Sequence, residues 1–284
     1  MVGGELVDFR RPNLIPVMRI IITGTSAGIG EYLAGRLAEA GHEIWGLARS
    51  TQKAAFATSA CDVSQWEQVE RASGEVARRW SHVDAIICGA AIQGAIGPAM
   101  QVDPRKWSQT LRVDLDGTYF VLRAFWNLLR QSPQRTKVIC FAGGGATNAR
   151  PNFSAYAVAK TGVVRLVETL AVEWKDTPVD INAISPGAIN TAMTRETVSM
   201  GPELAGRAEF EGAQRRLAEG AQSIEKVHGI VEFLLSEKSD GITGRLLSAQ
   251  WDDWAGLSAH AAPLAESEIY QLRRILPEER GAKF

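Results

Sequence analysis

The stretch that decides the fold is Arg19-Ile20-Ile21-Ile22-Thr23-Gly24-Thr25-Ser26-Ala27-Gly28-Ile29-Gly30. Its first five residues form a short run rich in β-branched side chains, which is typical of a strand buried on both faces. The glycines follow at once, and a helical pattern of apolar residues then continues to Gly41. The next strand is predicted from His42 to Leu47, so the segment predicts a strand, a glycine-rich turn, a helix and a strand.

This turn has the properties of a dinucleotide site. Glycine lets a backbone turn tightly and approach a pyrophosphate, and the start of the helix offers free N–H groups and the positive end of a dipole. The alternative is a plain turn between strand and helix, which the matching elements on both sides disfavour. Cofactor contacts are therefore predicted at Gly24, Thr25, Ser26, Gly28, Ile29 and Gly30.

The rest of the chain repeats the alternation of strand and helix. Strands are predicted to end near Cys61 and to span 83–88, 137–141, 180–184 and 244–247; helices are predicted over 65–80, 107–129, about 156–174 and 224–235. This order predicts a doubly wound parallel sheet of the Rossmann type, an α/β fold of three layers with ligands at the carboxyl ends of the strands. We expect a single domain over 18–250, an N-terminal arm over 1–17 and a C-terminal extension over 251–284.

Composition limits the partners. Lys and Arg total 31 against 32 Asp and Glu, so the net charge of −1 gives no electrostatic reason to expect nucleic acid or an anionic membrane. No stretch approaches the roughly 18 apolar residues of a membrane span, and we recognise no secretory signal. The cysteines, Cys61, Cys88 and Cys140, lack metal-like spacing. They are interpreted as buried thiols in a reducing compartment, so we expect a cytoplasmic protein without a metal site.

Tyr156 and Lys160 are four residues apart, which on a helix puts the phenol and the ammonium on one face. A free phenol has a pKa of about 10. A nearby cation favours the phenolate and brings the Tyr into range as a proton donor or acceptor. Alone, this spacing occurs by chance in many helices, as two unrelated surface residues.

Taken together, these features resemble the short-chain dehydrogenases/reductases. The matching motifs are Thr23-Gly24-x-x-x-Gly28-Ile29-Gly30, Asp62-Val63, Tyr156-x-x-x-Lys160 and Pro186-Gly187-x-Ile189-x-Thr191, in the family's order over about 18–250. The resemblance implies a nicotinamide cofactor and hydride exchange between an alcohol and a carbonyl. It implies that Tyr156 donates or removes the substrate proton, while Lys160 lowers the pKa of Tyr156 and bonds the nicotinamide ribose.

The same resemblance distributes the other cofactor contacts. It places Asp62 and Val63 beside the adenine and the small residue Ala90 beside the adenosine. It assigns the nicotinamide end to Ile189 and Thr191, and it adds Pro186 and Gly187 of the same motif as cofactor contacts. The second predicted strand ends in Ala48 and Arg49, where enzymes that use NAD commonly carry an acid. Arginine suits a 2′-phosphate, so NADP(H) is favoured over NAD(H); the alternative is a solvated surface arginine.

Two departures from the family pattern concern the site itself. The usual serine is missing, since neither Ala142 nor Gly143 has a hydroxyl. Either Thr147, Asn148 or Ser154 replaces it, or these residues serve a turn and a helix N-cap. The usual asparagine is Asp114, which either orders a water chain behind Lys160, as a third catalytic residue, or faces water.

Two further segments bear on substrate and assembly. A lid of short helices is predicted over 191–223; its arginines either hold an acidic substrate or lie on a solvated face (Arg195, Arg207, Arg215 and Arg216). In the extension, Trp251 and Trp254 either wall a pocket, bind a sugar or pack at a subunit contact. Leu272, Ile275 and Leu276 predict a short helix that docks on its own protein or, as the second choice, on a partner subunit. By analogy with the family we expect a homodimer or homotetramer.

Two functions remain open from the sequence. The first is an NADP(H)-dependent alcohol dehydrogenase or carbonyl reductase that acts on a small molecule. The second is a catalytically weakened descendant that keeps the nucleotide pocket for a structural or regulatory role, because a positioning group such as the missing serine is typically worth about 10²–10³ in rate.

Overall fold

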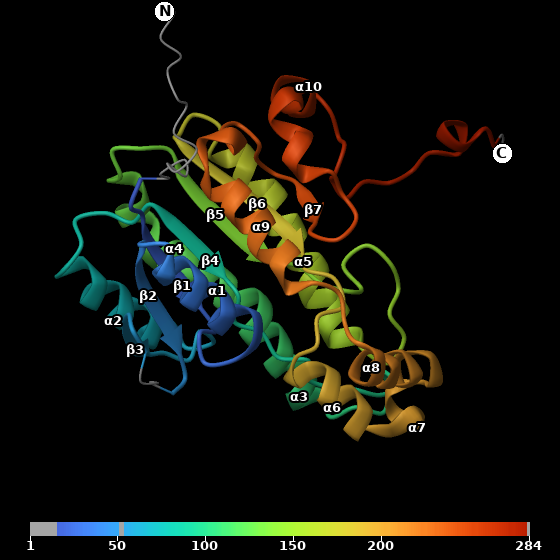
Figure 1. The fold of residues 1–284 in the computed structure, drawn as a ribbon. Coiled ribbons are helices and arrows are strands. Elements are labelled where there is room, and N and C mark those ends of the chain that lie inside the picture. Colours follow the sequence, from blue (N-terminus) through green and yellow to red (C-terminus); the bar gives the residue numbers. More distant parts are fainter. Residues whose placement is uncertain (1–15, 51–53, 283–284) are drawn as a thin grey trace, which may run out of the picture.

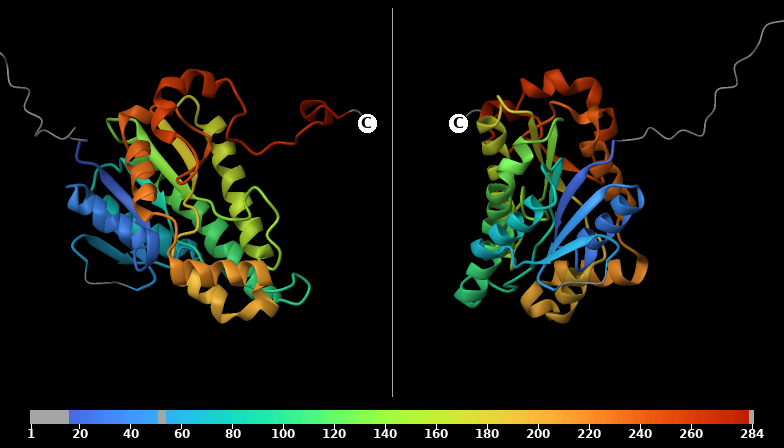
Figure 2. Two further views of the ribbon diagram at one scale, coloured as in Figure 1. Left: turned by 45° about the vertical axis from the view of Figure 1, so that its right-hand side comes forward. Right: turned by 90° about the vertical axis from the view of Figure 1, so that its left-hand side faces the viewer.

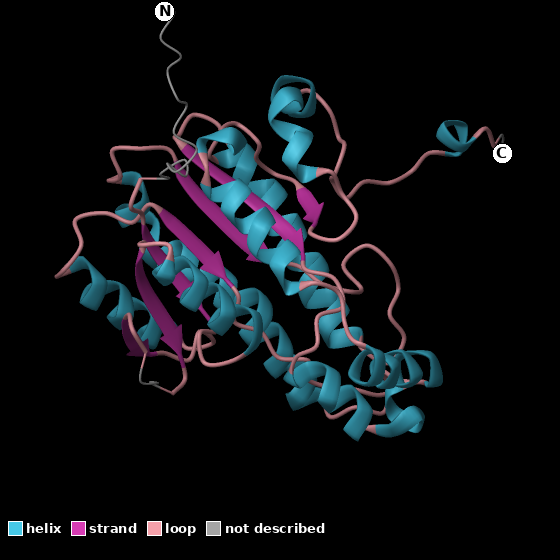
Figure 3. Cartoon of the chain, in the orientation of Figure 1, coloured by secondary structure: helices cyan, strands magenta, loops and turns pink. Residues whose placement is uncertain are grey.

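The computed structural model describes residues 16–50 and 54–282. Within these residues seven parallel strands form one sheet in the order β3-β2-β1-β4-β5-β6-β7 (Figures 1 and 3). The strands are β1 (Arg19–Thr23), β2 (Glu43–Ala48), β3 (Ala57–Ala60), β4 (Ala85–Cys88), β5 (Thr136–Phe141), β6 (Val179–Ser185) and β7 (Leu246–Ser248). The predicted doubly wound parallel fold is confirmed.

Helices form a layer on each side of the sheet, as the right-hand view of Figure 2 shows. The helices are α1 (Gly28–Glu39), α2 (Trp66–Ala77), α3 (Pro104–Leu111), α4 (Gly117–Arg130), α5 (Ser154–Glu173), α6 (Ala192–Ser199), α7 (Gly201–Ala205), α8 (Arg207–Glu219), α9 (Ile224–Leu235) and α10 (Ala261–Ala265). The apolar faces of α2, α4 and α5 share one core cluster, and those of α1 and α9 share the other.

Strand β1 shows why its sequence is apolar throughout. Ile20 and Ile22 belong to the core cluster with α1 and α9, and Ile21 belongs to the opposite cluster. Successive side chains of a strand point to opposite faces, and all three isoleucines are 0% exposed, so both faces of the strand are covered. The run of β-branched residues is therefore the mark of a central strand in this fold.

The long helix predicted over 107–129 is interrupted. Helix α3 continues into a π-helical turn (Arg112–Asp116) and then into α4. A π-turn inserts an extra residue into a helix and is frequent at functional sites. Asp114 lies at the centre of this turn, and its side chain is fully buried.

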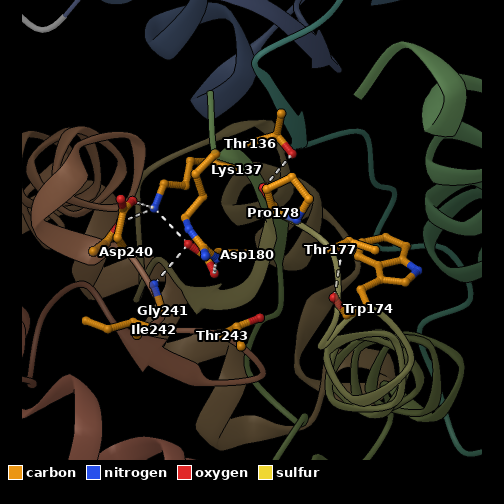
Figure 4. Close-up of polar contacts among 12 residues, drawn as sticks. Thr136, Lys137, Trp174, Thr177, Pro178, Asp180, Asp240, Gly241, Ile242 and Thr243 are labelled. Atoms are coloured by element: carbon orange, nitrogen blue, oxygen red, sulfur yellow. Dashed lines mark hydrogen bonds and ion pairs between the residues drawn. The ribbon is translucent and has the colours of Figure 1, made fainter. Parts of the chain in front are cut away.

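The amino end of the sheet contains a buried group of charges (Figure 4). Lys137 Nζ lies 2.9 Å from Asp180 Oδ2 and 2.6 Å from Asp240 Oδ1. Asp180 also pairs with Arg135 at 2.9 Å and accepts a hydrogen bond from the Gly241 N–H at 3.2 Å. Since Lys137 and Asp180 are 3% and 2% exposed, this network joins β5, β6 and the turn before β7 in the interior.

The C-terminal extension packs on the fold as far as residue 272. The Arg245 guanidinium is buried and donates to the carbonyl oxygens of Ser267 and Ile269, at 2.8 Å each, and of Leu264. The Leu246 N–H donates to the Tyr270 carbonyl at 2.8 Å, so the extension covers the edge of β7. Beyond this point the chain runs away from the body of the molecule (Figures 1 and 2).

The docking helix predicted around Leu272, Ile275 and Leu276 is wrong. Residues 272–276 form no helix. The Leu272 N–H donates to Glu168 Oε1 on α5 at 2.6 Å, and its carbonyl accepts from the Arg165 guanidinium, so this backbone is bonded to another element. Leu272 packs on the core, whereas Ile275 and Leu276 are exposed.

Other expectations concern single residues. The three cysteines are buried, as predicted. No helix in residues 16–50 and 54–282 is long and apolar enough to cross a membrane. Most of the predicted N-terminal arm, residues 1–15, lies outside the described part of the chain.

Candidate active site

A cavity of about 890 Å³ lies where the carboxyl ends of the strands meet the lid helices. This volume is in the usual range for small-molecule and cofactor sites. The structure brings most of the predicted site residues to its wall: Gly24, Ser26, Gly28, Ile29, Gly30, Arg49, Asp62, Val63, Ala90, Tyr156, Lys160, Pro186, Gly187, Ile189 and Thr191. Asp114 lies behind the wall, against Lys160, and Thr25 does not line the cavity.

The glycine turn fits a pyrophosphate. A β-carbon on Gly24 would lie 2.9 Å from the backbone of Ala90, and one on Gly30 would lie 2.4 Å from the Gly24 carbonyl oxygen. These two glycines therefore let the backbone segments pack closely, which leaves the start of α1 open to the cavity. The buried Thr25 instead faces β2, since a β-carbon on Gly46 would lie 2.6 Å from Thr25 Oγ1.

The predicted adenosine end lies at the carboxyl ends of β2 and β3, which are neighbours in the sheet. Arg49 is exposed directly after β2, whereas Ala48 is buried. Asp62 follows β3, and its Oδ1 accepts hydrogen bonds from the Ser64 N–H at 3.0 Å and the Ser64 hydroxyl at 2.7 Å. The loop after β3 is thereby held with Asp62 at the cavity wall.

Tyr156 and Lys160 lie in the first two turns of α5. The Lys160 ammonium is 5.5 Å from the centre of the Tyr156 ring and donates to the Phe141 carbonyl oxygen at 3.2 Å. It also lies 3.3 Å from Asp114 Oδ2. Lys160 is 3% exposed, so the ammonium is held in the interior by groups from three elements.

Asp114 is part of this arrangement. The alternative that it faces water is wrong, because the residue is 0% exposed. Its Oδ1 accepts a hydrogen bond from the Ile92 N–H at 2.9 Å, and its Oδ2 faces Lys160. The π-turn thus directs a carboxylate at the lysine, where it forms an ion pair that an amide does not provide.

The electrostatics favour a protonated Tyr156. Burial raises the pKa of the phenol, the Lys160 ammonium opposes this, and the Asp114 carboxylate adds to the rise. Lys160 therefore acts in the predicted direction, but the pKa of Tyr156 still lies above its usual value. Burial acts to lower the pKa of Lys160, but Asp114 and Tyr156 outweigh it and raise this pKa, so the ammonium stays charged. Burial also raises the pKa of Asp114 against the pull of Lys160.

Of the two residues considered for the absent serine, Gly143 lies next to the phenol. A β-carbon on Gly143 would lie 2.5 Å from the Tyr156 hydroxyl oxygen and 3.2 Å from the ring. Of the three residues considered as replacements, only Asn148 lines the cavity. The hydroxyl of Ser154 accepts instead from the Trp107 indole at 3.1 Å, and Thr147 accepts from the Asn148 amide at 3.2 Å. Ser154 begins α5 and is not its N-cap, a position that Phe153 holds.

Two residues of the cavity wall were missed by the sequence patterns. Arg150, in the loop between β5 and α5, makes two 2.9 Å hydrogen bonds to Glu209 of α8, and its guanidinium carbon lies 3.9 Å from the Phe153 ring centre. The buried Gln93 donates to Thr197 Oγ1 at 2.9 Å, and its Oε1 has no partner among the described residues. Their only sequence signal was a polar residue in a loop after a predicted strand.

The lid and the extension also contribute to the wall. Helices α6, α7 and α8 confirm the short helices predicted over 191–223. Of the four lid arginines only Arg216 lines the cavity. Trp251 lies at its rim with 79% exposure, whereas Trp254 packs on Phe233 of α9, with 5.9 Å between ring centres. Among the described residues no group of three or more His, Cys, Asp or Glu side chains is placed to hold a metal.

Known proteins share both the sequence pattern and the fold. Residues 24–250 match a family model described as enoyl-(acyl carrier protein) reductase. A short chain dehydrogenase of Monascus purpureus is 30% identical over 275 residues, which cover 90% of this chain and 88% of that protein. Levodione reductase of Leifsonia aquatica is 28% identical over 243 residues, which cover 80% of this chain and 91% of that protein. A Shigella flexneri protein solved in complex with NADP has the same fold, with a TM-score of 0.72 at 20% identity over 84% of this chain and 100% of that one.

Proposed function

Since the chain belongs to the short-chain dehydrogenase/reductase family, whose members bind a nicotinamide cofactor, we propose that it is an NADP(H)-dependent oxidoreductase acting on a small alcohol or carbonyl compound. The observation that carries this proposal is the buried pair of Asp114 and Lys160, since Lys160 and Tyr156 line one cavity with the glycine turn and Asp114 lies behind Lys160. Burying charges costs free energy, so a protein that had lost catalysis would have no need to keep a lysine and a carboxylate in its interior.

The proposed chemistry assigns one task to each residue. The nicotinamide, when bound, supplies the hydride. Tyr156 donates its proton to the carbonyl oxygen of the substrate, and the Lys160 ammonium stabilises the phenolate that remains. Asp114 and the Phe141 carbonyl hold Lys160 in place, while the Ile92 N–H holds Asp114. The raised pKa of Tyr156 keeps the proton on the phenol at neutral pH, which favours carbonyl reduction there.

The preference for NADP(H) rests on the end of β2. Arg49 is exposed beside the cavity, and the position before it holds alanine instead of an acid that would repel a 2′-phosphate. A guanidinium binds phosphate through charge-assisted hydrogen bonds. The NADP complex of the Shigella flexneri protein is consistent with this choice of cofactor.

The proposal is tested with Tyr156→Phe. We expect carbonyl reduction with NADPH to fall by about 10²–10⁴, the size of general acid catalysis, because the proton donor is gone. The dissociation constant of NADPH, measured by fluorescence titration, should stay close to that of the original protein. Unchanged turnover would remove Tyr156 from the reaction.

No observation favours the alternative, a nucleotide-binding protein without catalysis. It would gain support if the unmodified protein bound NADPH and reduced no member of a broad carbonyl panel. The cytoplasmic location and the homodimeric or homotetrameric assembly stay predictions.

A further inference from the structure

Four charged side chains line the part of the cavity that the lid covers. Arg150 comes from the loop before α5, Glu196 comes from α6, and Glu209 and Arg216 come from α8. Both carboxylate oxygens of Glu209 accept from Arg150, at 2.9 Å each. Glu209 is therefore paired with Arg150, and this pair is neutral as a whole, which leaves Glu196 and Arg216.

Arg216 is the positive charge that remains after Arg150 and Glu209 have paired. It lines the cavity and is half-buried, and within the described part of the chain no carboxylate forms an ion pair with it. Burial lowers the pKa of its guanidinium, Glu209 opposes this, and the neighbouring Arg150 and Arg215 lower it further. A cation that is partly removed from water and lies near two others is stabilised when an anion arrives.

Arg150 is less available than Arg216 to bind an anion. Two of its nitrogens are bound to Glu209, and its guanidinium lies over the Phe153 ring, which fixes it as part of the wall. It is 5.6 Å from the centre of the Tyr156 ring, so the wall connects the reacting end of the cavity with the lid. The open guanidinium of Arg216 lies at the lid end.

We propose that the substrate carries an anionic group, a carboxylate or a phosphate monoester, which binds Arg216 while its carbonyl group lies at Tyr156. A guanidinium presents paired donors that match either anion. The inference rests on the proposed oxidoreductase function and adds the class of substrate.

The contact between the anionic group and Arg216 also compensates for the missing serine. Without a hydroxyl at Gly143, the chain lacks the usual second group that orients the substrate oxygen. An ionic contact at the far end of the substrate restricts its position, and well-oriented reactants react faster because the entropy of alignment is already lost on binding. The lost hydroxyl and the arginine without an ion pair are then parts of one solution.

The experiment compares substrates that differ only in charge. One series contains oxo acids of increasing chain length, each with its methyl ester; the other contains the corresponding terminal phosphates, each with its free alcohol. We expect kcat/KM with NADPH to favour the anion of the best-fitting pair by about ten- to a hundredfold, the size of a charge-assisted hydrogen bond. The series that shows the preference tells carboxylate from phosphate.

Arg216→Gln should remove this preference, mainly through KM, and Arg216→Lys should retain part of it. The matched control is Arg215→Gln, because Arg215 is the next residue on the same helix but is exposed and outside the cavity. It should keep the preference. Equal use of the anion and its uncharged partner in both series by the original protein, or the same loss in both variants, would overturn the inference.

A binding measurement separates this inference from the proposed function. Calorimetry on the NADPH-loaded Tyr156→Phe protein should show oxo-acid binding that Arg216→Gln weakens about tenfold or more. If this binding is present and the original protein reduces nothing, the anion site stands and the oxidoreductase proposal falls. If carbonyls are reduced without regard to charge, the oxidoreductase proposal stands and the anion site falls.

Discussion

A β-carbon on Gly143 would lie 2.5 Å from the hydroxyl oxygen of Tyr156. Carbon and oxygen atoms that are not bonded cannot approach so closely, so any side chain at residue 143 must move the phenol. The absence of a side chain at residue 143 and the position of Tyr156 are therefore linked. The hydroxyl of Tyr156 occupies the space in which a side chain at residue 143 would begin.

Gly143→Ala should slow catalysis. The methyl group displaces the phenol and supplies no donor, and a shift of about 1 Å at a reacting group costs roughly 10²-fold. Gly143→Ser displaces the phenol equally but adds a hydroxyl beside the substrate oxygen, so it should be about 10²-fold faster than the alanine variant. Single-turnover reduction measures both. An alanine variant as fast as the original protein would show that the phenol moves freely, and equal rates for both variants would mean that the hydroxyl finds no substrate.

The pH dependence should report the charge of Asp114. Its carboxylate raises the pKa of Tyr156, so Asp114→Asn should lower this pKa. Reduction needs the protonated phenol and falls as pH rises through that pKa, so its alkaline limb should move to lower pH. Oxidation of the alcohol needs the phenolate, and its rising limb should move the same way.

The matched control for this measurement is Asp116→Asn. Asp116 belongs to the same π-turn but is exposed, so its charge is screened by water. Profiles of kcat against pH should be unchanged in this variant. A shift of equal size in both variants would point to a general change of charge and not to the buried ion pair.

Arg49→Gln should weaken NADPH binding by about ten- to a hundredfold, because a charge-assisted contact with the 2′-phosphate is lost. NADH has no such phosphate, so its dissociation constant should change little. Ala48→Asp should also raise the dissociation constant of NADPH, because a carboxylate there repels the 2′-phosphate. It should favour NADH, because the same carboxylate accepts a hydrogen bond from a ribose hydroxyl. A tighter dissociation constant for NADH than for NADPH in the original protein would contradict the preference itself.

The buried charges at the amino end of the sheet should govern stability and not catalysis. Asp180→Asn leaves Arg135 without its carboxylate, whereas Lys137 keeps Asp240. Leaving a buried charge without any partner typically costs about 3–5 kcal/mol, so the loss should approach this range without exceeding it. Urea unfolding measures the loss. Arg36→Gln removes an exposed pair with Glu39 and should cost less than about 1 kcal/mol. Similar losses in both variants would mean that burial does not strengthen the network.

The sequence predicted what depends on local period and on motifs. The apolar run of β1, the glycine turn and the spacing of Tyr156 and Lys160 are each contained in one short segment, and the fold places them as expected. The strand order then carries Asp62 and Thr191 to the same cavity wall. These features needed no knowledge of contacts between distant residues.

What the sequence could not predict depends on pairing across the chain. Arg150 and Glu209 are 59 residues apart, and neither belongs to a periodic pattern that would connect them. The π-turn has no composition signal, so Asp114 looked equally suited to water and to the interior. The segment around Leu272 has helical spacing, but its backbone hydrogen bonds go to Glu168 and Arg165 on α5.

Arg245 shows that the family model and the fold end at different residues. The match to the family model stops at residue 250, yet the carbonyl groups that accept from the buried guanidinium belong to residues 264–269. A protein shortened to residue 250 would lose these three acceptors, and water would have to take their place at a guanidinium that is now buried. The fold therefore depends on the extension, and any fusion partner or affinity tag belongs after residue 272, where the chain leaves the body.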